Sequence, residues 1–443
     1  HQDHVADMIA DPSAPEVSRR IRADLAQVDL DLVERLMRGE GLAVQRDGHV
    51  EPADVLPWTY ACSPEAVACR KEGLELLERG KVAAVMVAGG QGSRLGHDGP
   101  KGCVRATPLE RKSLFRVFSE QVLALSRRTG RDIPWFIMTS RENDAPTRAF
   151  FESNGFFGLN ASAVHFFVQG MFPSLSLDGK FLLSSEGGVF LNPDGHGGVF
   201  RALRISGCLD LMRDMGIEEI FTFQVDNPLV KVCDPLFIGL HHRRGAQISS
   251  KVVRKTSFDE KVGVIVKQGA RTFLVEYSDM DDTLRYATAP DGTMLHWAGS
   301  IAVHVIDRVF AEHVASRDGA LPYHRAVKTI RAMGPDASIV TVDGVKFETF
   351  IFDALPLART SVTLEVLRAE EFAPIKNATG NDSLESSRAL QVARHVSWLT
   401  SAGVRVADGV AVEISPLFAY DADDLMTKRS SLPDVISRDT YFG

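Results

Sequence analysis

The sequence lacks three features that would assign it early to a class of protein: a long hydrophobic run, a cysteine pattern and a block of basic residues. The longest apolar run, residues 82–88, is far shorter than the roughly 20 residues needed to cross a bilayer, so we expect no membrane partner. The five cysteines are odd in number and form no C-x-x-C pair, which argues against a disulfide framework or a zinc knuckle and favours a reducing, cytoplasmic compartment. Lys and Arg number 50 against 58 Asp and Glu, a formal net charge of −8 with no basic block, so we expect no nucleic-acid partner.

What is present is the composition of an ordinary folded chain, with 44% hydrophobic and 24% charged residues over 443 positions, enough for two or three domains. The first ~75 residues show helical periodicity. Ser13 as a cap and Pro15 in the first turn predict the start of one helix, and the glycines at 39 and 41 end a second. A third helix is expected over residues 64–79. We assign residues 1–76 to a helical N-terminal region with a packing role.

From residue 81 the pattern changes to short apolar runs that alternate with helical segments. Strands are expected at 82–87, 135–138 and 220–225, and helices at 113–127, 145–153 and 199–215. This alternation predicts a doubly wound, Rossmann-like α/β domain, which we place at residues 77–355. Residues 356–443 are expected to form a small C-terminal module, with a helix at 386–401 that leads into alternating apolar residues at 404–414.

A glycine cluster follows the first of these strands. Four glycines within residues 89–96 let the backbone approach a ligand closely and turn its N–H groups toward phosphate oxygens. Arg94 and Lys101 add two cations, a combination that suits a triphosphate. No lysine stands where a Walker A loop requires one, and Leu95 stands where the dinucleotide fingerprint G-x-G-x-x-G needs its third glycine.

A family resemblance is carried by Gly89-Gly90-x-Gly92-Ser93-Arg94-Leu95-Gly96 followed by Pro100-Lys101. This run resembles the signature of the eukaryotic-type UTP–sugar-1-phosphate uridylyltransferases, and most of all their UDP-N-acetylhexosamine pyrophosphorylase branch. Further motifs match in the same order, at residues 133–140, 166–171, 193–198, 225–230, 275–278, 372–377 and 413–417. The resemblance implies a nucleotidyltransferase that converts UTP and a sugar 1-phosphate, its small-molecule substrates, into a UDP-sugar and pyrophosphate.

The same resemblance implies which groups act on the phosphates. Arg94 and Lys101 would bind the departing β- and γ-phosphates, and Lys346 would reach the reacting phosphates. Asp226 follows the expected strand 220–225, where open α/β sheets place their ligands, and would help to hold Mg²⁺. In-line transfer between phosphates requires positioning and neutralised charge rather than a nucleophilic side chain, so a site of cations, backbone N–H groups and a metal ion suits it.

The resemblance also implies which residues recognise the two substrates. Uracil recognition would use the glycine loop and two later positions: Ala88, Gly89, Gly90, Gln169 and Gly195. The side-chain amide of Gln169 can donate and accept at the edge of a base. Binding of the sugar phosphate would use a second group: His196, Asn227, Glu276, Trp297, Gly299, Ser300 and Lys376.

Three of these positions depart from the acetylhexosamine enzymes, because His196, Trp297 and Ser300 stand where that branch has asparagines. A Gly-His-Gly at this place is instead similar to the UDP-glucose and broad-specificity UDP-sugar pyrophosphorylases. Trp297 either faces the sugar or packs in the core. N-acetylhexosamine 1-phosphate is therefore the first choice of substrate, with glucose 1-phosphate or a broad range of sugar phosphates as the alternative.

Two other classes of protein are considered. A glycosyltransferase would use a D-x-D motif, and residues 279–281 fit that string, but they stand in an acidic run that we interpret as a solvated loop. A non-catalytic UDP-sugar sensor would have lost Arg94 or Lys101, and both are present. The pair His241 and His242 lacks the spacing of metal ligands and is interpreted as a solvated helix end. The sequence leaves the oligomeric state open.

Overall fold

The computed structural model describes residues 2–43, 50–317, 319–334 and 338–443. Contacts group the chain into two compact units. The first unit consists of His1–Gly48, Gln169–Ile205 and His313–Ala354, and the second of His49–Val168, Ser206–Glu312 and Leu355–Gly443. The units are interleaved along the chain. The division into three consecutive domains, at residues 1–76, 77–355 and 356–443, stays a prediction from the sequence.

The first unit packs three N-terminal helices against a small antiparallel sheet. The helices are α1 (Asp3–Ala10), α2 (Pro15–Leu25) and α3 (Leu30–Met37), and the sheet has the order β14 (His324–Met333), β15 (Ile339–Glu348), β7 (Leu175–Ser176). Ile21 and Leu36 from the helices share one buried cluster with Val345 and Phe347 from β15. The expected cap of α2 is wrong, because Ala14 precedes the helix and the Ser13 hydroxyl donates to Asp11 instead.

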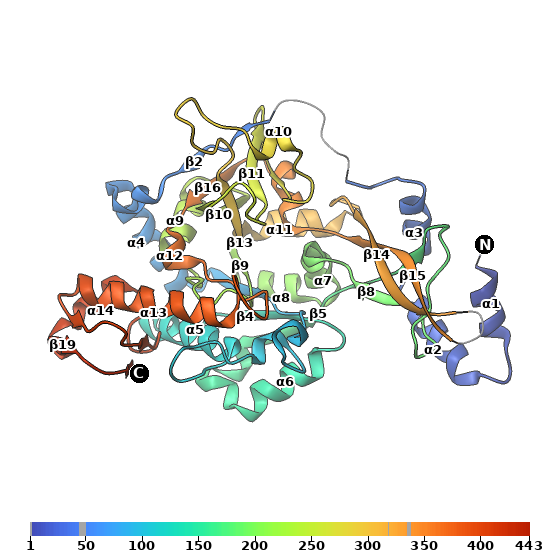
Figure 1. The fold of residues 1–443 in the computed structure, drawn as a ribbon, viewed down its shortest axis with the longest axis horizontal. Coiled ribbons are helices and arrows are strands. Elements are labelled where there is room, and N and C mark those ends of the chain that lie inside the picture. Colours follow the sequence, from blue (N-terminus) through green and yellow to red (C-terminus); the bar gives the residue numbers. More distant parts are fainter. Residues whose placement is uncertain (1, 44–49, 318, 335–337) are drawn as a thin grey trace. The chain divides into compact units, whose positions relative to one another are not determined.

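The second unit is built on a large mixed sheet, drawn in Figure 1. Its main path is β2 (Val55–Leu56), β16 (Ser361–Glu365), β10 (Ile248–Arg254), β13 (Ala298–Asp307), β9 (Glu219–Gln224), β3 (Val82–Val87), β4 (Trp135–Thr139) and β5 (Val164–Val168). The strands β9, β3, β4 and β5 are mutually parallel, as the doubly wound prediction requires, and this part of the prediction is confirmed. Strand β13 runs antiparallel to both of its neighbours, β9 and β10, which makes the sheet mixed.

The second unit also contains helices and three strands that lie off the main path of the sheet. The helices of this unit before its C-terminal part are α4 (Pro64–Glu78), α5 (Leu114–Thr129), α6 (Asp144–Ser153), α8 (Cys208–Asp214), α9 (Pro235–Arg243) and α10 (Asp282–Arg285), and α11 (Arg308–Ser316) bridges its boundary. Strands β1 (Glu51–Pro52), β11 (Val264–Gln268) and β12 (Arg271–Val275) extend the sheet off its main path. The single helix expected at 199–215 is broken into α7 (Val199–Ile205) and α8, because Gly207 adopts a left-handed φ of 75° between them.

The C-terminal part of the second unit contains α12 (Arg368–Glu371), α13 (Leu384–Ser401) and α14 (Ala422–Thr427). The alternating segment 404–414 forms two short strands, β17 (Arg405–Val406) and β18 (Val412–Ile414). Each pairs in parallel with a later strand, β19 (Val435–Ile436) and β20 (Thr440–Phe442). Across the described ranges, no helix combines the length and the apolar character needed to span a membrane.

The segment that follows the glycine cluster passes directly beneath α5. Gly102, in the 3-10 turn Lys101–Cys103, lies against the fully buried ring of Phe115, and a Cβ at this position would overlap that ring. The absence of a side chain therefore allows the turn to approach the helix.

We predict that Gly102→Ala lowers the free energy of unfolding by about 1–3 kcal/mol, because the added methyl group overpacks the core beside Phe115. Urea denaturation followed by circular dichroism measures the change. Gly90→Ala is the matched control, since no atom lies within 4 Å of the corresponding Cβ position. Equal stability of the two variants would contradict the prediction.

Candidate functional site

The parallel strands β3 and β9 are neighbours, and both deliver candidate residues at their carboxyl ends. Their register pairs Val87 with Gln224, the last residue of each strand. Ala88 and the glycine loop follow β3, and Asp226 follows β9. From β3 the chain continues through α5 to β4 on one side, while β9 lies on the other side. The loops therefore emerge at a topological switch point, the position where open α/β sheets bind ligands.

The glycine loop is folded back on itself and held from one side. The Gly92 N–H donates to the Gly99 carbonyl at 2.8 Å, and the Lys101 N–H donates to the Gly90 carbonyl at 3.0 Å. The amide of Asn143 donates to the carbonyls of both Gly89 (2.8 Å) and Gly90 (3.0 Å). These bonds bring Lys101 back to the start of the loop.

Asn143 is a site residue that the sequence analysis missed. It is 1% exposed and lies at the start of α6, four residues beyond the end of β4. A polar residue shortly after the carboxyl end of a parallel strand is the signal that could have identified it.

Lys101 and Asp226, predicted to bind phosphate and Mg²⁺, form an ion pair. Lys101 Nζ lies 3.3 Å from Asp226 Oδ2, and the side chains are 17% and 14% exposed. Within the described ranges, no three His, Cys, Asp or Glu side chains gather into a metal site. Mg²⁺ is commonly held by one or two carboxylates together with substrate phosphates and water, so a single carboxylate beside a loop that is predicted to bind phosphate fits the expected ion.

The other residues that are predicted to bind phosphate groups in this unit differ in their surroundings. Arg94 is exposed on the 3-10 turn Ser93–Leu95. The Ile375 N–H donates to the Asp226 carbonyl at 2.8 Å, so Lys376 comes directly after a residue bonded to the Asp226 backbone. The buried amide of Asn227 donates to the Glu371 carbonyl (2.7 Å) and accepts the Ala373 N–H (2.9 Å). Asn227 therefore anchors the segment that carries Lys376, and its predicted contact with the sugar phosphate stays a prediction.

Four candidate sugar residues of this unit lie on or beside β12 and β13: Glu276 follows β12, Trp297 precedes β13, and Gly299 and Ser300 lie on β13. The Ser300 N–H donates to the Gly263 carbonyl at 2.9 Å, and a Cβ on Gly263 would lie 3.3 Å from Glu276 Oε1, so these two candidates are brought together. A Cβ on Gly299 would lie 3.3 Å from the Val253 carbonyl, within the strand pair β10–β13. The Arg254 guanidinium lies 3.9 Å from the ring centroid of Trp297, which places the indole in a packing contact.

In the first unit, the two predicted uracil residues are in direct contact. The Gln169 amide donates to the Gly195 carbonyl at 2.8 Å. Gly195 has a φ of 87°, and a Cβ there would overlap the backbone of Thr349. The two segments are also joined by a hydrogen bond, in which the Gly197 N–H donates to the Thr349 carbonyl at 2.8 Å. Glycine is therefore required at 195 both for its conformation and for space.

His196 follows this glycine and lies against two aromatic rings. Its centroid is 5.1 Å from that of Phe350 and 5.6 Å from that of Phe352, and its Nδ1 accepts the Ile351 N–H at 3.2 Å. Burial and the nearby His324 lower the pKa of His196 to about 4, so the ring is neutral at pH 7. With Nδ1 accepting, the proton resides on Nε2, and His196 offers a neutral hydrogen-bond donor.

Two further groups belong to the same unit. Lys346 lies on β15, half-buried, with Nζ 5.9 Å from the centroid of Phe190, and burial lowers its pKa. The rings of Phe350 and Phe352 were missed by the sequence analysis. Their signal is the aromatic repeat Phe347-x-x-Phe350-x-Phe352, which begins in the last residues of the strand with Lys346.

Two interpretations of charged segments can be compared with the structure. The pair His241 and His242 is not a solvated helix end, because His241 is buried and both rings contact the Glu219 carboxylate, at 3.1 and 2.8 Å. In the acidic run, Asp281 caps α10 by accepting the Leu284 N–H at 2.8 Å, and Met280 is buried. These residues serve local structure.

Asp194 is a further residue that the sequence analysis missed. It precedes Gly195, is 5% exposed, and its Oδ1 has no hydrogen-bond partner among the described residues. A Cβ on either Gly170 or Gly198 would overlap its carboxyl group, so two glycines make room for it. Burial raises the pKa of Asp194 to about 6.

We predict that Asp194 makes the first unit less stable as the pH rises. Because its folded pKa of about 6 exceeds the ordinary 3.8, the stabilisation is complete below about pH 4 and is lost as the pH rises through 6. The loss is about 2–3 kcal/mol. Urea denaturation at pH 4.5 and 7.5 should show a smaller difference in Asp194→Asn than in the wild type.

Asp7→Asn, on the exposed side of α1, is the control for a general charge effect. An Asp194→Asn variant with the pH dependence of the wild type would refute the assignment.

Comparison with known proteins connects this geometry to a family. Residues 60–439 match the family described as UTP–glucose-1-phosphate uridylyltransferase. The chain is 35% identical to UDP-N-acetylglucosamine diphosphorylase 2 of Arabidopsis thaliana, covering 94% of this chain and 87% of the relative. It is 37% identical to the UDP-N-acetylglucosamine pyrophosphorylase of Saccharomyces cerevisiae, covering 80% and 77%.

The structure agrees with these sequence relationships. The solved structure of the uridine diphosphate N-acetylglucosamine pyrophosphorylase of Trypanosoma brucei superimposes with a TM-score of 0.84 at 25% identity, covering 100% of this chain and 96% of that one. A glycine loop closed on Lys101 beside Asp226, on a sheet of this topology, is thus found in a chain that matches one family over most of its length. The chain belongs to the UTP–glucose-1-phosphate uridylyltransferase family.

Proposed function

We propose that this member of a nucleotidyltransferase family transfers the uridylyl group of UTP to a sugar 1-phosphate, with an N-acetylhexosamine 1-phosphate as the preferred acceptor. The observation that carries the proposal is the phosphate edge of the second unit, which consists of the glycine loop after β3, Lys101, and Asp226 after β9. There the Lys101 N–H donates to the Gly90 carbonyl, and the Lys101 ammonium lies 3.3 Å from Asp226. The names of the relatives, UDP-N-acetylglucosamine diphosphorylase and pyrophosphorylase, support the choice of sugar.

In the proposed reaction, an oxygen of the sugar phosphate attacks the α-phosphorus of UTP in line, and the bond to the β-phosphate breaks to release pyrophosphate. Lys101 and Arg94 neutralise the departing pyrophosphate, while Lys346 and Lys376 act on the reacting phosphates. Asp226 would hold Mg²⁺, which supplies additional positive charge to the phosphates when it is bound. Gln169, Gly195 and the loop 88–90 hold the uracil end.

His196 is proposed to act at the sugar. A neutral ring with its proton on Nε2 can donate to an acetamido carbonyl or to a sugar hydroxyl. Trp297 is engaged with Arg254, so its indole is not proposed to exclude the acetyl group. The histidine in place of an amide favours a second candidate, a UDP-glucose or broad-specificity UDP-sugar pyrophosphorylase. A non-catalytic sensor is less favoured because the Lys101–Asp226 pair is intact.

The compartment is also a proposal. All five cysteines are free thiols, and three of them, Cys69, Cys208 and Cys233, are buried. Unpaired thiols are typical of a reducing compartment, so we propose a cytoplasmic enzyme.

We predict that Lys101→Ala lowers kcat/KM for pyrophosphate release by about 10²–10³, because the developing charge on pyrophosphate loses a fixed cation. Arg94→Ala should have an effect in the same direction. Release of pyrophosphate from UTP, Mg²⁺ and N-acetylglucosamine 1-phosphate measures it.

Lys71→Ala, an exposed lysine on α4, serves as the matched control and should retain full activity. Thermal unfolding of each variant confirms that the fold is kept. If Lys101→Ala turned over within twofold of the wild type, the assignment of this lysine to the phosphates would be wrong.

We predict that His196→Asn changes sugar preference rather than nucleotide binding. The ratio of kcat/KM for N-acetylglucosamine 1-phosphate to that for glucose 1-phosphate should rise by about fivefold or more, because an amide can both donate to and accept from the acetamido group. The KM for UTP should stay within twofold. His313→Asn, the same substitution at an exposed position on α11, should leave both quantities unchanged; an unaltered sugar ratio in His196→Asn would remove this residue from the sugar site.

A further inference from the structure

The second unit contains a cavity of ≈ 510 Å³ that none of the predicted site residues lines. Its walls come from the loop before α9, the end of β16, helices α12 and α13, and the segments 107–121 and 413–423. The volume lies within the range of pockets that hold small organic ligands. The cavity is therefore distinct from the proposed phosphate edge.

The charge of the cavity wall is predominantly negative. Eight carboxylates line it, against four Lys and Arg side chains. Two of these cations are already paired, since Lys112 lies 2.6 Å from Glu120 and Lys231 lies 2.9 Å from Asp421. Three cations behind the wall, Lys251, Arg116 and Arg254, contact lining carboxylates, and the carboxylates still remain in excess.

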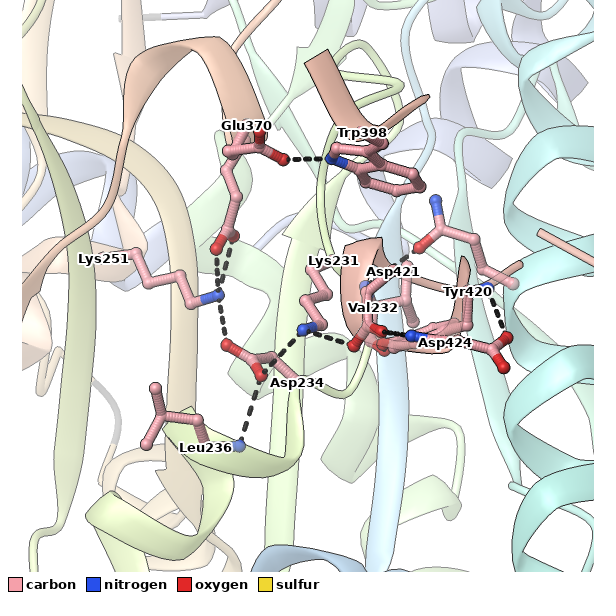
Figure 2. A network of polar contacts seen from close by, with 12 residues as sticks. Lys231, Val232, Asp234, Leu236, Lys251, Glu370, Trp398, Tyr420, Asp421 and Asp424 are labelled. Carbon is pink, nitrogen blue, oxygen red and sulfur yellow. Dashed lines mark hydrogen bonds and ion pairs between the residues drawn. The ribbon is translucent and has the colours of Figure 1, made fainter. Parts of the chain in front are cut away.

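One cation that pairs with these carboxylates, Lys251, is fully buried. Its Nζ lies 2.8 Å from Asp234 and 2.6 Å from Glu371, with the side chain 0% exposed (Figure 2). Lys231 approaches Asp234 from the other side at 3.9 Å. Burial and the neighbouring Asp234 raise the pKa of Glu371, and Lys251 opposes this shift.

Three aromatic side chains also contribute to the wall. Trp58, Trp398 and Tyr420 all line the cavity. Trp398 is fixed by its indole N–H, which donates to Glu370 at 2.8 Å. Two of the rings already lie against cations of the wall, since the Arg394 guanidinium is 5.0 Å from the centroid of Trp398 and Lys231 Nζ is 5.6 Å from that of Tyr420. Aromatic rings beside carboxylates are the surroundings that favour an organic cation, through cation–π attraction and charge.

The wall is connected to the phosphate edge at two places. The carbonyl of Glu371 accepts from Asn227, the neighbour of Asp226. On another side, the Glu413 carboxylate accepts the N–H groups of Leu109 (2.7 Å) and Glu110 (2.9 Å), in the segment that follows the turn Lys101–Cys103. A molecule that shifts Glu371 or Glu413 therefore acts on the segments next to Asp226 and Lys101.

We propose that this cavity is an effector site for an organic cation, an ammonium group on an aromatic or apolar body, and that its occupancy changes turnover. Binding is a property of the cavity and does not depend on the proposed sugar specificity. Calorimetry therefore tests it even if the assigned substrate is wrong.

The probe is tryptamine, titrated into the full chain by isothermal calorimetry. Indole-3-propionate carries the same ring with a carboxylate and should bind about tenfold more weakly or worse, because the wall carries excess negative charge. Tryptamine should still bind when UTP and N-acetylglucosamine 1-phosphate are saturating. Absence of tryptamine binding, or its loss in the presence of both substrates, overturns the proposal.

Two variants locate the binding. Glu370→Gln removes one negative charge while its amide oxygen can still accept from Trp398, and Asp423→Asn removes an exposed charge of the wall. Each should weaken tryptamine binding about threefold or more. Asp408→Asn, an exposed acid that does not line the cavity, is the control and should bind as the wild type does. Identical binding by all three variants overturns the location.

The effect on turnover is measured with both substrates saturating. Tryptamine should change kcat for pyrophosphate release by about fivefold, the lower range of typical coupling between sites. The same concentration should have a smaller effect on Glu370→Gln. A bound probe that leaves kcat unchanged would show a ligand site without an effector role and would refute that part of the proposal.

Discussion

The parallel pairing of β3 with β9 is the constraint on which the second unit depends. Because Val87 and Gln224 are paired, both strands end at one level, and the glycine loop and Asp226 leave the sheet beside each other. A one-residue slip would turn every side chain of the strand to the opposite face. All six residues of β3 pair with β9, from Val82 with Glu219 to Val87 with Gln224, and they are buried or nearly so.

The ion pair at the end of these strands is partly exposed, whereas a second group of charges in the same unit is buried. Lys101 and Asp226 keep some contact with water, so their pairing can be exchanged for contacts with phosphate or a metal ion. Lys251 has no such contact and is held by both Asp234 and Glu371, so loss of the lysine would leave Glu371 as a buried carboxylate without its cation. Asp226 is thus connected to these buried charges, which join β10, α9 and α12, because the amide of its neighbour Asn227 donates to the Glu371 carbonyl.

The sequence predicted the parts of this structure that local pattern controls. The apolar run of β3, the glycine cluster and the lysine after it are contiguous, so strand, loop and cation could be placed together. Asn143 and Asp194 were missed because their importance comes from what they approach, the carbonyls of Gly89 and Gly90 in one case and two glycines in the other. The burial of His241 was not predicted for the same reason, since its partner Glu219 lies on another element, the strand β9.

Both units are assembled from distant pieces of chain, and this orders the events of synthesis. Helices α1–α3 emerge from the ribosome early, but the strands β14 and β15 that cover their apolar faces emerge only after most of the second unit has been made. In that second unit, Lys112 donates to the Tyr441 hydroxyl at 2.8 Å, and β20 completes the pairing of β18. Non-local contacts of this kind form slowly and leave apolar surface uncovered in the meantime. The growing chain therefore carries two incomplete cores at once, and neither can close until its last segment has been translated.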